Sequence, residues 1–173
     1  MKDIKSKTNW FNVLAGVFVL VAFILLIATT GAETSGYIGV VKVSTEIKGT
    51  VILFGGGDYN HKGSSIGLMA FIFAILAFLA ICIVAVIKFL KKDKNQSLNK
   101  ILNVGLISAA LIAILAGIFV LITKNDFVSK NGLESNPIDS FKTKMSPTYI
   151  MSGVLLILGG IVAAVDPILH IKD

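Results

Sequence analysis

Four long apolar runs constrain the fold of this chain more than any other feature of its sequence. They extend over about 11–30, 66–90, 101–123 and 149–168. A helix rises about 1.5 Å per residue, so about 20 residues cross the roughly 30 Å hydrocarbon layer of a membrane. A helix also satisfies its own backbone groups, which an isolated strand in lipid cannot do. The runs therefore predict four transmembrane helices with these bounds.

Composition excludes an ordinary soluble domain. Hydrophobic residues make up 55% of the chain and charged residues 15%, whereas about 25% is charged in a typical globular domain. The expected fold class is an all-α membrane protein, an antiparallel four-helix bundle that forms a single membrane domain over residues 1–173. Two external loops are expected at about 31–65 and 124–148, and a short cytoplasmic loop at about 91–100.

Lysines predict the orientation in the membrane. Lysines precede the first run, and a dense group separates the second run from the third: Lys88, Lys91, Lys92, Lys94 and Lys100. Cytoplasmic loops are enriched in basic residues, so both termini and the short loop are expected in the cytoplasm. All 16 basic residues are lysine, which indicates A+T-rich coding and favours the plasma membrane of a prokaryote with such a genome.

A cleaved signal peptide is the alternative for the first run. Thr30, Gly31 and Ala32 have the small side chains of a cleavage site. The preceding run of about 18 apolar residues is longer than the usual 7 to 15. We therefore expect the first helix to be retained.

The first external loop is expected to form a β-hairpin. Over Val41 to Lys48, apolar and polar residues alternate with the period of a half-buried strand. Lys48 and Gly49 suggest a turn, after which Val51 to Phe54 would pair back, with Ile47 opposite Thr50 and Val43 opposite Phe54. Because a hairpin alone is marginally stable, either a third strand or a partner is expected to complete the sheet. Phe127 and Val128 in the second loop are candidates for the third strand.

Small residues predict where the helices pack. They recur at four-residue spacing, which aligns them on one helix face and allows close backbone approach. The candidates are Gly105, Ala109, Ala113, Gly117, Gly160 and Ala164. Packing within the bundle is the simpler interpretation, and contact with another subunit is the alternative.

The four apolar runs contain few ionisable or polar residues. Asp166 lies near the end of the fourth run and His170 follows four residues later, on the same face if the helix continues. Two interpretations stand: a solvated helix end at the interface, which we favour, and a proton or cation site at an inner mouth. Trp10 and Tyr149, at the edges of their runs, suggest interfacial anchors.

No other group of residues predicts a catalytic, cofactor or metal site. Asp58 and His61 supply only two of the three or four ligands that a metal needs, so a surface turn is expected there. Cys82, the single cysteine, lies inside an apolar run and reads as an inert thiol. Nothing in the sequence resembles a catalytic triad, a nucleic-acid-binding surface or a small-molecule site.

The predicted layout is similar to that of claudin-type tetraspan proteins, which have cytoplasmic ends, a larger first external loop with β-structure and a smaller second one. That family's first loop carries a tryptophan motif and a cysteine pair, whereas Trp10 and Cys82 lie elsewhere here. The likeness is one of topology along the whole chain. It implies an external sheet over a four-helix bundle, and no paracellular function.

The expected function is therefore non-enzymatic. A structural, scaffold or accessory subunit would sit in the lipid bilayer and bind another membrane protein or a second copy through its helices and hairpin. The alternative is a small oligomeric channel or transporter with Asp166 near the inner mouth.

Overall fold

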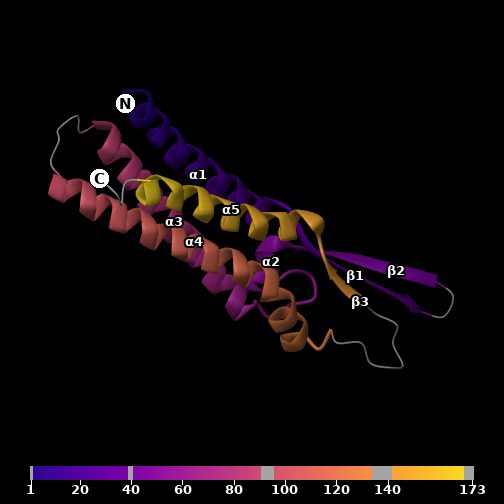
Figure 1. The fold of residues 1–173 in the computed structure, drawn as a ribbon. Helices are drawn as coiled ribbons and strands as arrows, with labels where there is room; N and C mark the ends of the chain where they lie inside the picture. The colour runs from indigo at the N-terminus through magenta and orange to yellow at the C-terminus, as the bar shows by residue number, and fades with distance from the viewer. Residues whose placement is uncertain (1, 39–40, 91–95, 134–141, 170–173) are drawn as a thin grey trace.

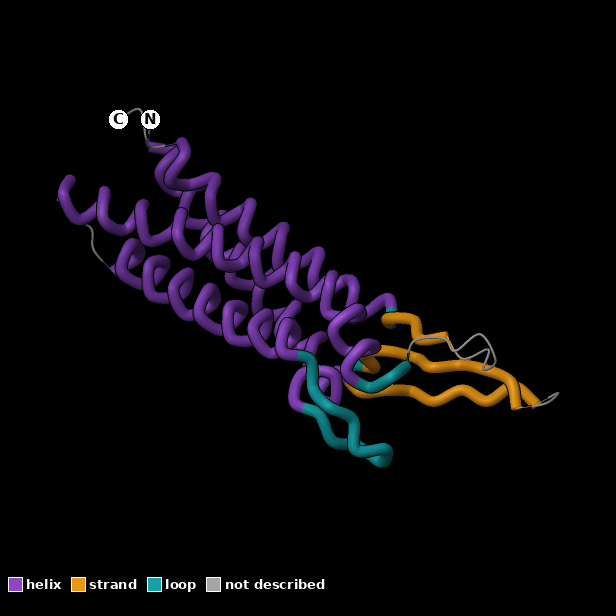
Figure 2. Tube along the Cα trace, turned by 90° about the horizontal axis from the view of Figure 1, so that it is seen from below, coloured by secondary structure: helices purple, strands orange, loops and turns teal. Residues whose placement is uncertain are grey.

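The computed structural model describes residues 2–38, 41–90, 96–133 and 142–169. Its elements follow in the order α1 (Lys2–Ala28), β1 (Thr30–Ile38), β2 (Val41–Lys48), α2 (Gly49–Phe54), α3 (Ser65–Leu90), α4 (Gln96–Lys130), β3 (Lys142–Met145) and α5 (Pro147–Leu169). The long helices run alternately up and down as a bundle, and the sheet extends from one end of it (Figure 1). The amino end of α1 and the carboxyl end of α5 lie at the opposite end (Figure 2).

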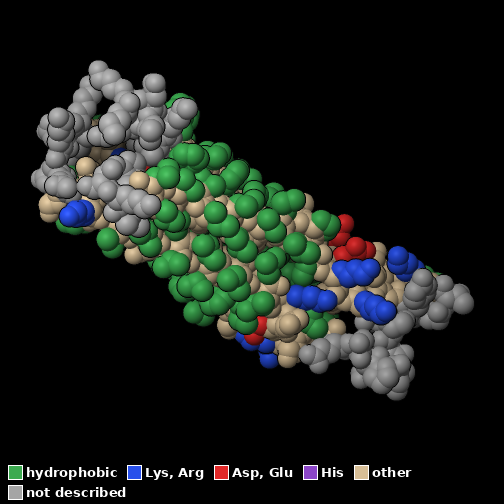
Figure 3. Space-filling model, viewed as in Figure 1, with side chains coloured by type: hydrophobic (Ala, Val, Ile, Leu, Met, Phe, Trp, Pro, Cys, Tyr) green, Lys and Arg blue, Asp and Glu red, His purple; other side chains and the backbone are tan. Residues whose placement is uncertain are grey.

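Within the described residues, α1, α3, α4 and α5 each contain a segment long and apolar enough to cross a membrane. In the bundle α1 packs on α3, α3 on α4, α4 on α5 and α5 on α1. Large apolar side chains cover the outside of the bundle (Figure 3), whereas much of the inside is alanine and glycine. This distribution is typical of helices that pack closely in lipid, so the fold is that of an integral membrane protein.

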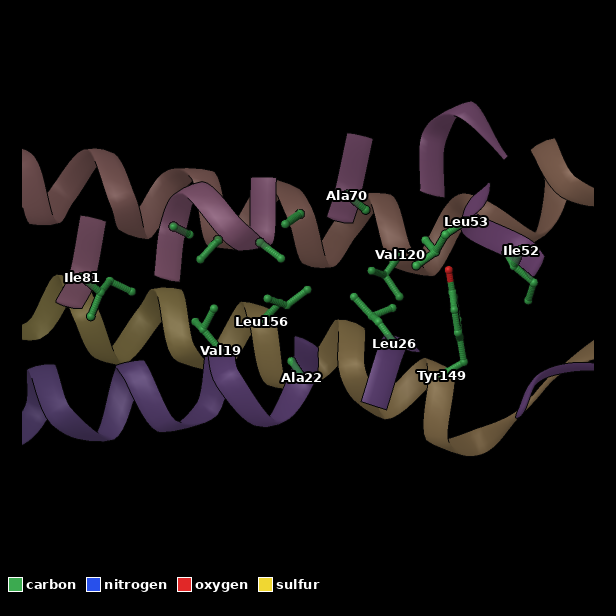
Figure 4. Packing of buried hydrophobic residues seen from close by; sticks show 14 of the residues in the cluster. Val19, Ala22, Leu26, Ile52, Leu53, Ala70, Ile81, Val120, Tyr149 and Leu156 are labelled. Atoms are coloured by element: carbon green, nitrogen blue, oxygen red, sulfur yellow. The ribbon is translucent and has the colours of Figure 1, made fainter. Parts of the chain in front are cut away.

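Buried residues in each helix recur at spacings of three and four, as the seam of a packed bundle requires. In α3 the seam is Gly67, Ala70, Ala74, Ala77, Ile81 and Val84. The core also contains larger residues that interdigitate along the bundle axis, among them Val19, Leu26, Leu156 and Val120 (Figure 4). The predicted helices are thus present, although α1 begins nine residues earlier than expected and α4 ends seven residues later, at Lys130.

Among the described residues the sheet has three antiparallel strands in the order β2-β1-β3. The predicted strand Val41–Lys48 is present as β2, and it forms an antiparallel pair with β1, the preceding strand. The predicted turn and the predicted partner residues are wrong. Ile47 lies opposite Ala32 rather than Thr50, and Val43 lies opposite Gly36 rather than Phe54. The partner strand β1 was not predicted, because it contains several small residues of low strand propensity.

The segment Val51 to Phe54, predicted as the returning strand, belongs instead to the short helix α2. This helix packs against the end of the bundle nearest the sheet. Ile52 and Leu53 are both fully buried, and adjacent residues of a strand would point to opposite faces. The first residue of α2, Gly49, has room only for a glycine, because a Cβ there would collide with the Leu26 carbonyl oxygen. A short apolar run is compatible with either a strand or a helix. This segment forms a helix because that conformation buries its apolar side chains against the bundle.

The third strand is also not where it was expected. Phe127 and Val128 lie in the last turns of α4, with Phe127 fully buried, and the third strand is β3. Thr34 and Thr143 face each other across β1 and β3, with their hydroxyl oxygens 3.0 Å apart. β3 leads directly into α5, so the sheet is attached to the bundle through both α1 and α5.

Tyr149 is a core residue, and its expected role as an interfacial anchor is wrong. Its side chain is fully buried and points toward the region of Val120 and Leu53 (Figure 4). Its hydroxyl lies beside Thr123 but makes no hydrogen bond of ordinary geometry within the described residues. The Thr123 hydroxyl itself donates to the Phe119 carbonyl at 2.7 Å. Trp10, in contrast, is 72% exposed near the start of α1.

We predict that Tyr149→Phe leaves the free energy of unfolding unchanged or raises it by up to about 1 kcal/mol, because a buried hydroxyl without a good partner costs desolvation energy. Reversible unfolding of both proteins in the same detergent would measure the difference. A loss of about 1 kcal/mol or more would mean that the hydroxyl has a productive partner, contrary to this interpretation.

Candidate functional site

The most distinctive chemistry of the bundle lies at the end opposite the sheet, where each long helix contributes one polar side chain. These are Asn12 from α1, Lys88 from α3, Asn103 from α4 and Asp166 from α5, and we call them the polar layer. Three of them continue a buried seam. Asn12 precedes Ala15 by three residues, Lys88 follows Val84 by four, and Asp166 follows Ala163 by three. The helical period therefore points them toward the bundle interior.

Hydrogen bonds join the layer across all these helices. The Lys88 ammonium donates to Asp166 Oδ2 at 2.6 Å and to Asn103 Oδ1 at 2.8 Å. The Asn12 amide donates to the same Asp166 oxygen at 3.0 Å. Asp166 therefore connects α5 to α1 and α3, and Lys88 extends the connection to α4.

The carboxylate of this ion pair is buried and the ammonium is partly buried. The side chain of Asp166 is 3% exposed and that of Lys88 is 13% exposed. Charges far from water are tolerated when they are paired and hydrogen-bonded, and the two formal charges of this pair cancel. Asn12 is also buried, and its Oδ1 has no hydrogen-bond partner within the described residues. Within the described residues, the layer is thus a hydrogen-bonded network that joins the four long helices at one end of the bundle.

This geometry corrects the sequence interpretation of Asp166 as a solvated helix end. α5 continues through Pro167 to Leu169, which keeps Asp166 on the inner face. His170, its expected companion, lies outside the described residues. Lys88 had been assigned to the cytoplasmic lysine group, but it belongs to the last turn of α3, and its side chain reaches back to Asp166.

A second polar cluster fixes the other end of α3. The Ser64 hydroxyl accepts a hydrogen bond from the Gly67 backbone at 2.9 Å and donates to Asp126 of α4 at 2.7 Å. The same carboxylate accepts the Ile66 backbone N–H at 3.3 Å and lies 3.3 Å from the Lys130 ammonium. An acidic group near a helix amino end is electrostatically favourable. α4 therefore needs its extra turns beyond the predicted end, because they carry this cap.

The predicted packing residues occupy different positions. A Cβ on Gly117 would lie 2.5 Å from the Gly153 carbonyl oxygen, and one on Gly160 would lie 2.6 Å from the Ala110 carbonyl oxygen. These two glycines therefore mark close approach of α4 and α5. Ala109 and Ala113 are buried and Ala164 is partly buried in the core, whereas a Cβ on Gly105 would make only an ordinary 3.7 Å contact. The contacts of Gly117 and Gly160 join α4 and α5 of one chain, and contact with another subunit stays a prediction.

A cleft of about 160 Å³ lies at the sheet end. Thr45 to Lys48 of β2 form one wall, and Gly57, Asp58, Tyr59 and His61 line the other. The predicted surface turn is present, because Asp58 to Asn60 are exposed and Asn60 donates its backbone N–H to the Gly57 carbonyl at 3.0 Å. Among the described residues no group of three or more potential metal ligands is found.

Comparisons with known proteins add no relationship: no protein-family model, curated protein or solved structure matches the chain.

Proposed function

We propose that this chain is a non-enzymatic scaffold or accessory subunit of the membrane, which holds a small sheet in a fixed position and binds a partner membrane protein. The observation that carries the proposal is that side-chain contacts join the helices at both ends of the bundle. The polar layer ties the helices at one end, and α2 with the α3 cap closes the other. A rigid support beneath an exposed sheet suits recognition better than catalysis or transport.

The polar layer supports this reading over a channel or transporter. Asp166 would have to exchange with water or ions to serve as an inner-mouth site, yet its side chain is 3% exposed and bonded to Lys88 and Asn12. Small residues such as Ala74, Ala77, Ala113 and Ala116 bring the helices together between the two ends. This arrangement favours packing over conduction.

For the orientation, we propose cytoplasmic termini and an extracytoplasmic sheet, on the ground of the lysine distribution. The test begins with Cys82→Ser, which removes the only native thiol. Ser44 is exposed on β2 and Ser97 is exposed near the start of α4, at the other end of the bundle. In intact cells a membrane-impermeant maleimide should label Ser44→Cys, and should label Ser97→Cys only after permeabilisation. The reverse pattern would overturn the orientation.

The accessory role is tested by native mass spectrometry of the protein extracted gently from its own membrane. We expect a second polypeptide at fixed stoichiometry, retained when Ser97 on the opposite end is changed to Ala. Recovery only as a bare monomer, with and without chemical cross-linking before extraction, would refute the accessory role.

A further inference from the structure

The edge of the sheet formed by β2 has the features of a binding site for an additional strand. β2 lies at one edge, since the strand order is β2-β1-β3. In the described part of the chain, no backbone hydrogen bond from another segment reaches the outer edge of Val41–Lys48. An unpaired strand edge presents a row of backbone donors and acceptors, which an extended segment can satisfy.

The cleft lies beside this edge. Its first wall comprises the consecutive residues Thr45, Glu46, Ile47 and Lys48. Consecutive strand residues point to alternate faces, so a cleft lined by all of them follows the strand's edge rather than one face. Val51 also lines it, from the neighbouring helix α2.

The second wall is preformed. Gly55, Gly56 and Gly57 all have positive φ, between 75° and 94°, a backbone conformation that side chains disfavour. Gly56 and His61 exchange two backbone hydrogen bonds, at 2.7 and 2.9 Å. The His61 ring packs on Phe127 of α4, with the ring centroids 5.7 Å apart. The wall is therefore anchored to the bundle, and an inserted segment would meet a rigid surface.

The charges along β2 specify the inserted strand. Lys42, Glu46 and Lys48 alternate with apolar or β-branched residues and are all exposed. Lysines are also prominent on the visible surface of the sheet (Figure 3). Oppositely charged residues that face each other across paired strands stabilise the pairing, and like charges destabilise it. A complementary strand needs acidic residues opposite both lysines and a basic residue opposite Glu46.

We propose that β2 accepts an extended segment of the partner protein as a fourth, antiparallel strand, with the charge order acidic, basic, acidic along it. The inference rests on the proposed accessory function and identifies its docking site. The partner's basic residue would lie opposite Glu46, on the side of the cleft that also carries Asp58. Its apolar residues would extend the row formed by Val43, Thr45 and Ile47.

The test uses three labelled peptides and the full-length protein in lipid nanodiscs. The matched peptide is Glu-Val-Lys-Val-Thr-Val-Glu-Val, and the swapped peptide is Lys-Val-Glu-Val-Thr-Val-Lys-Val. Two N-methylated forms of the matched peptide block alternate backbone donors. By fluorescence anisotropy at low salt we expect the matched peptide to bind at least tenfold more tightly than the swapped one. One N-methylated form should lose at least tenfold, because only one set of donors faces β2.

Matched variants separate the edge from general electrostatics. Lys42→Glu, Glu46→Lys and Lys48→Glu together should reverse the peptide preference. Lys142→Glu with Lys144→Glu, on β3 at the other edge, should leave the preference in place. The proposal is overturned if both N-methylated forms bind like the parent, if the β2 variant keeps the original preference, or if the β3 variant abolishes it.

Two further outcomes distinguish this inference from the proposed function. If native mass spectrometry finds a partner but the matched peptide does not bind, the docking site is wrong and the accessory role stands. If Ser44→Cys, made in a Cys82→Ser background, forms a disulfide between two copies that excludes the peptide, a second copy occupies the edge. That result also refutes a partner strand at β2.

Discussion

Lys88→Met is expected to lower the free energy of unfolding by about 1–3 kcal/mol, the usual cost of removing one hydrogen-bonding partner from a buried polar group. The change removes the Lys88 ammonium, which lies 2.6 Å from the Asp166 carboxylate inside the bundle. Asp166→Asn should cost less, because the long Lys88 side chain lies in the last turn of α3 and can turn toward the interface. Reversible unfolding in a single detergent or lipid measures both.

The double variant Lys88→Met with Asp166→Leu is the control. Replacing a buried ion pair by apolar residues of similar size is often neutral, so the double variant should recover most of the stability that Lys88→Met loses. Such non-additivity is the signature of direct coupling. Additive losses in the double variant would show that the polar layer does not act as a unit.

Gly117→Ala is expected to cost about 1–3 kcal/mol, the typical penalty for overpacking a filled core. The added Cβ would lie 2.5 Å from the Gly153 carbonyl oxygen and 2.6 Å from a side-chain carbon of Ile157. Backbone cannot move aside as a side-chain tip can, so α4 and α5 must separate. The same unfolding assay measures the effect.

Gly105→Ala is the matched control, since it is the same substitution in the same helix and was predicted from the same stripe. There the new Cβ meets Val84 at an ordinary 3.7 Å. Alanine is also favoured over glycine in a helix by about 1 kcal/mol. The protein should therefore be unchanged or slightly more stable. Equal losses at both positions would contradict the close α4–α5 contact.

The helices could be predicted from the sequence because each apolar run is long enough to have one structural solution in lipid. The sheet was only partly predictable. β2 has the alternation of a strand, but β1 is poor in strand formers, and the run Val51 to Phe54 becomes a helix because the open end of the bundle can bury Ile52 and Leu53. That burial is a tertiary effect, which local propensity does not contain.

The polar layer could have been found by following the packing period to its ends. Lys88 continues the seam of Ile81 and Val84, and Asp166 continues that of Ala163, so both positions face inward. The loop pattern of the lysines hides the inward position of Lys88, and the short distance of Asp166 from the helix end hides its burial. Asn12 gives a weaker signal, since its role depends on the facing carboxylate.

The claim that the polar layer fastens the bundle and does not conduct is tested most directly by cation and proton flux into sealed proteoliposomes. The wild-type protein should give the same flux as empty vesicles, with an added ionophore confirming that the vesicles hold a gradient. Asp166→Asn should leave this baseline unchanged. Flux above the baseline that Asp166→Asn abolishes would contradict the account and identify Asp166 as part of a pathway.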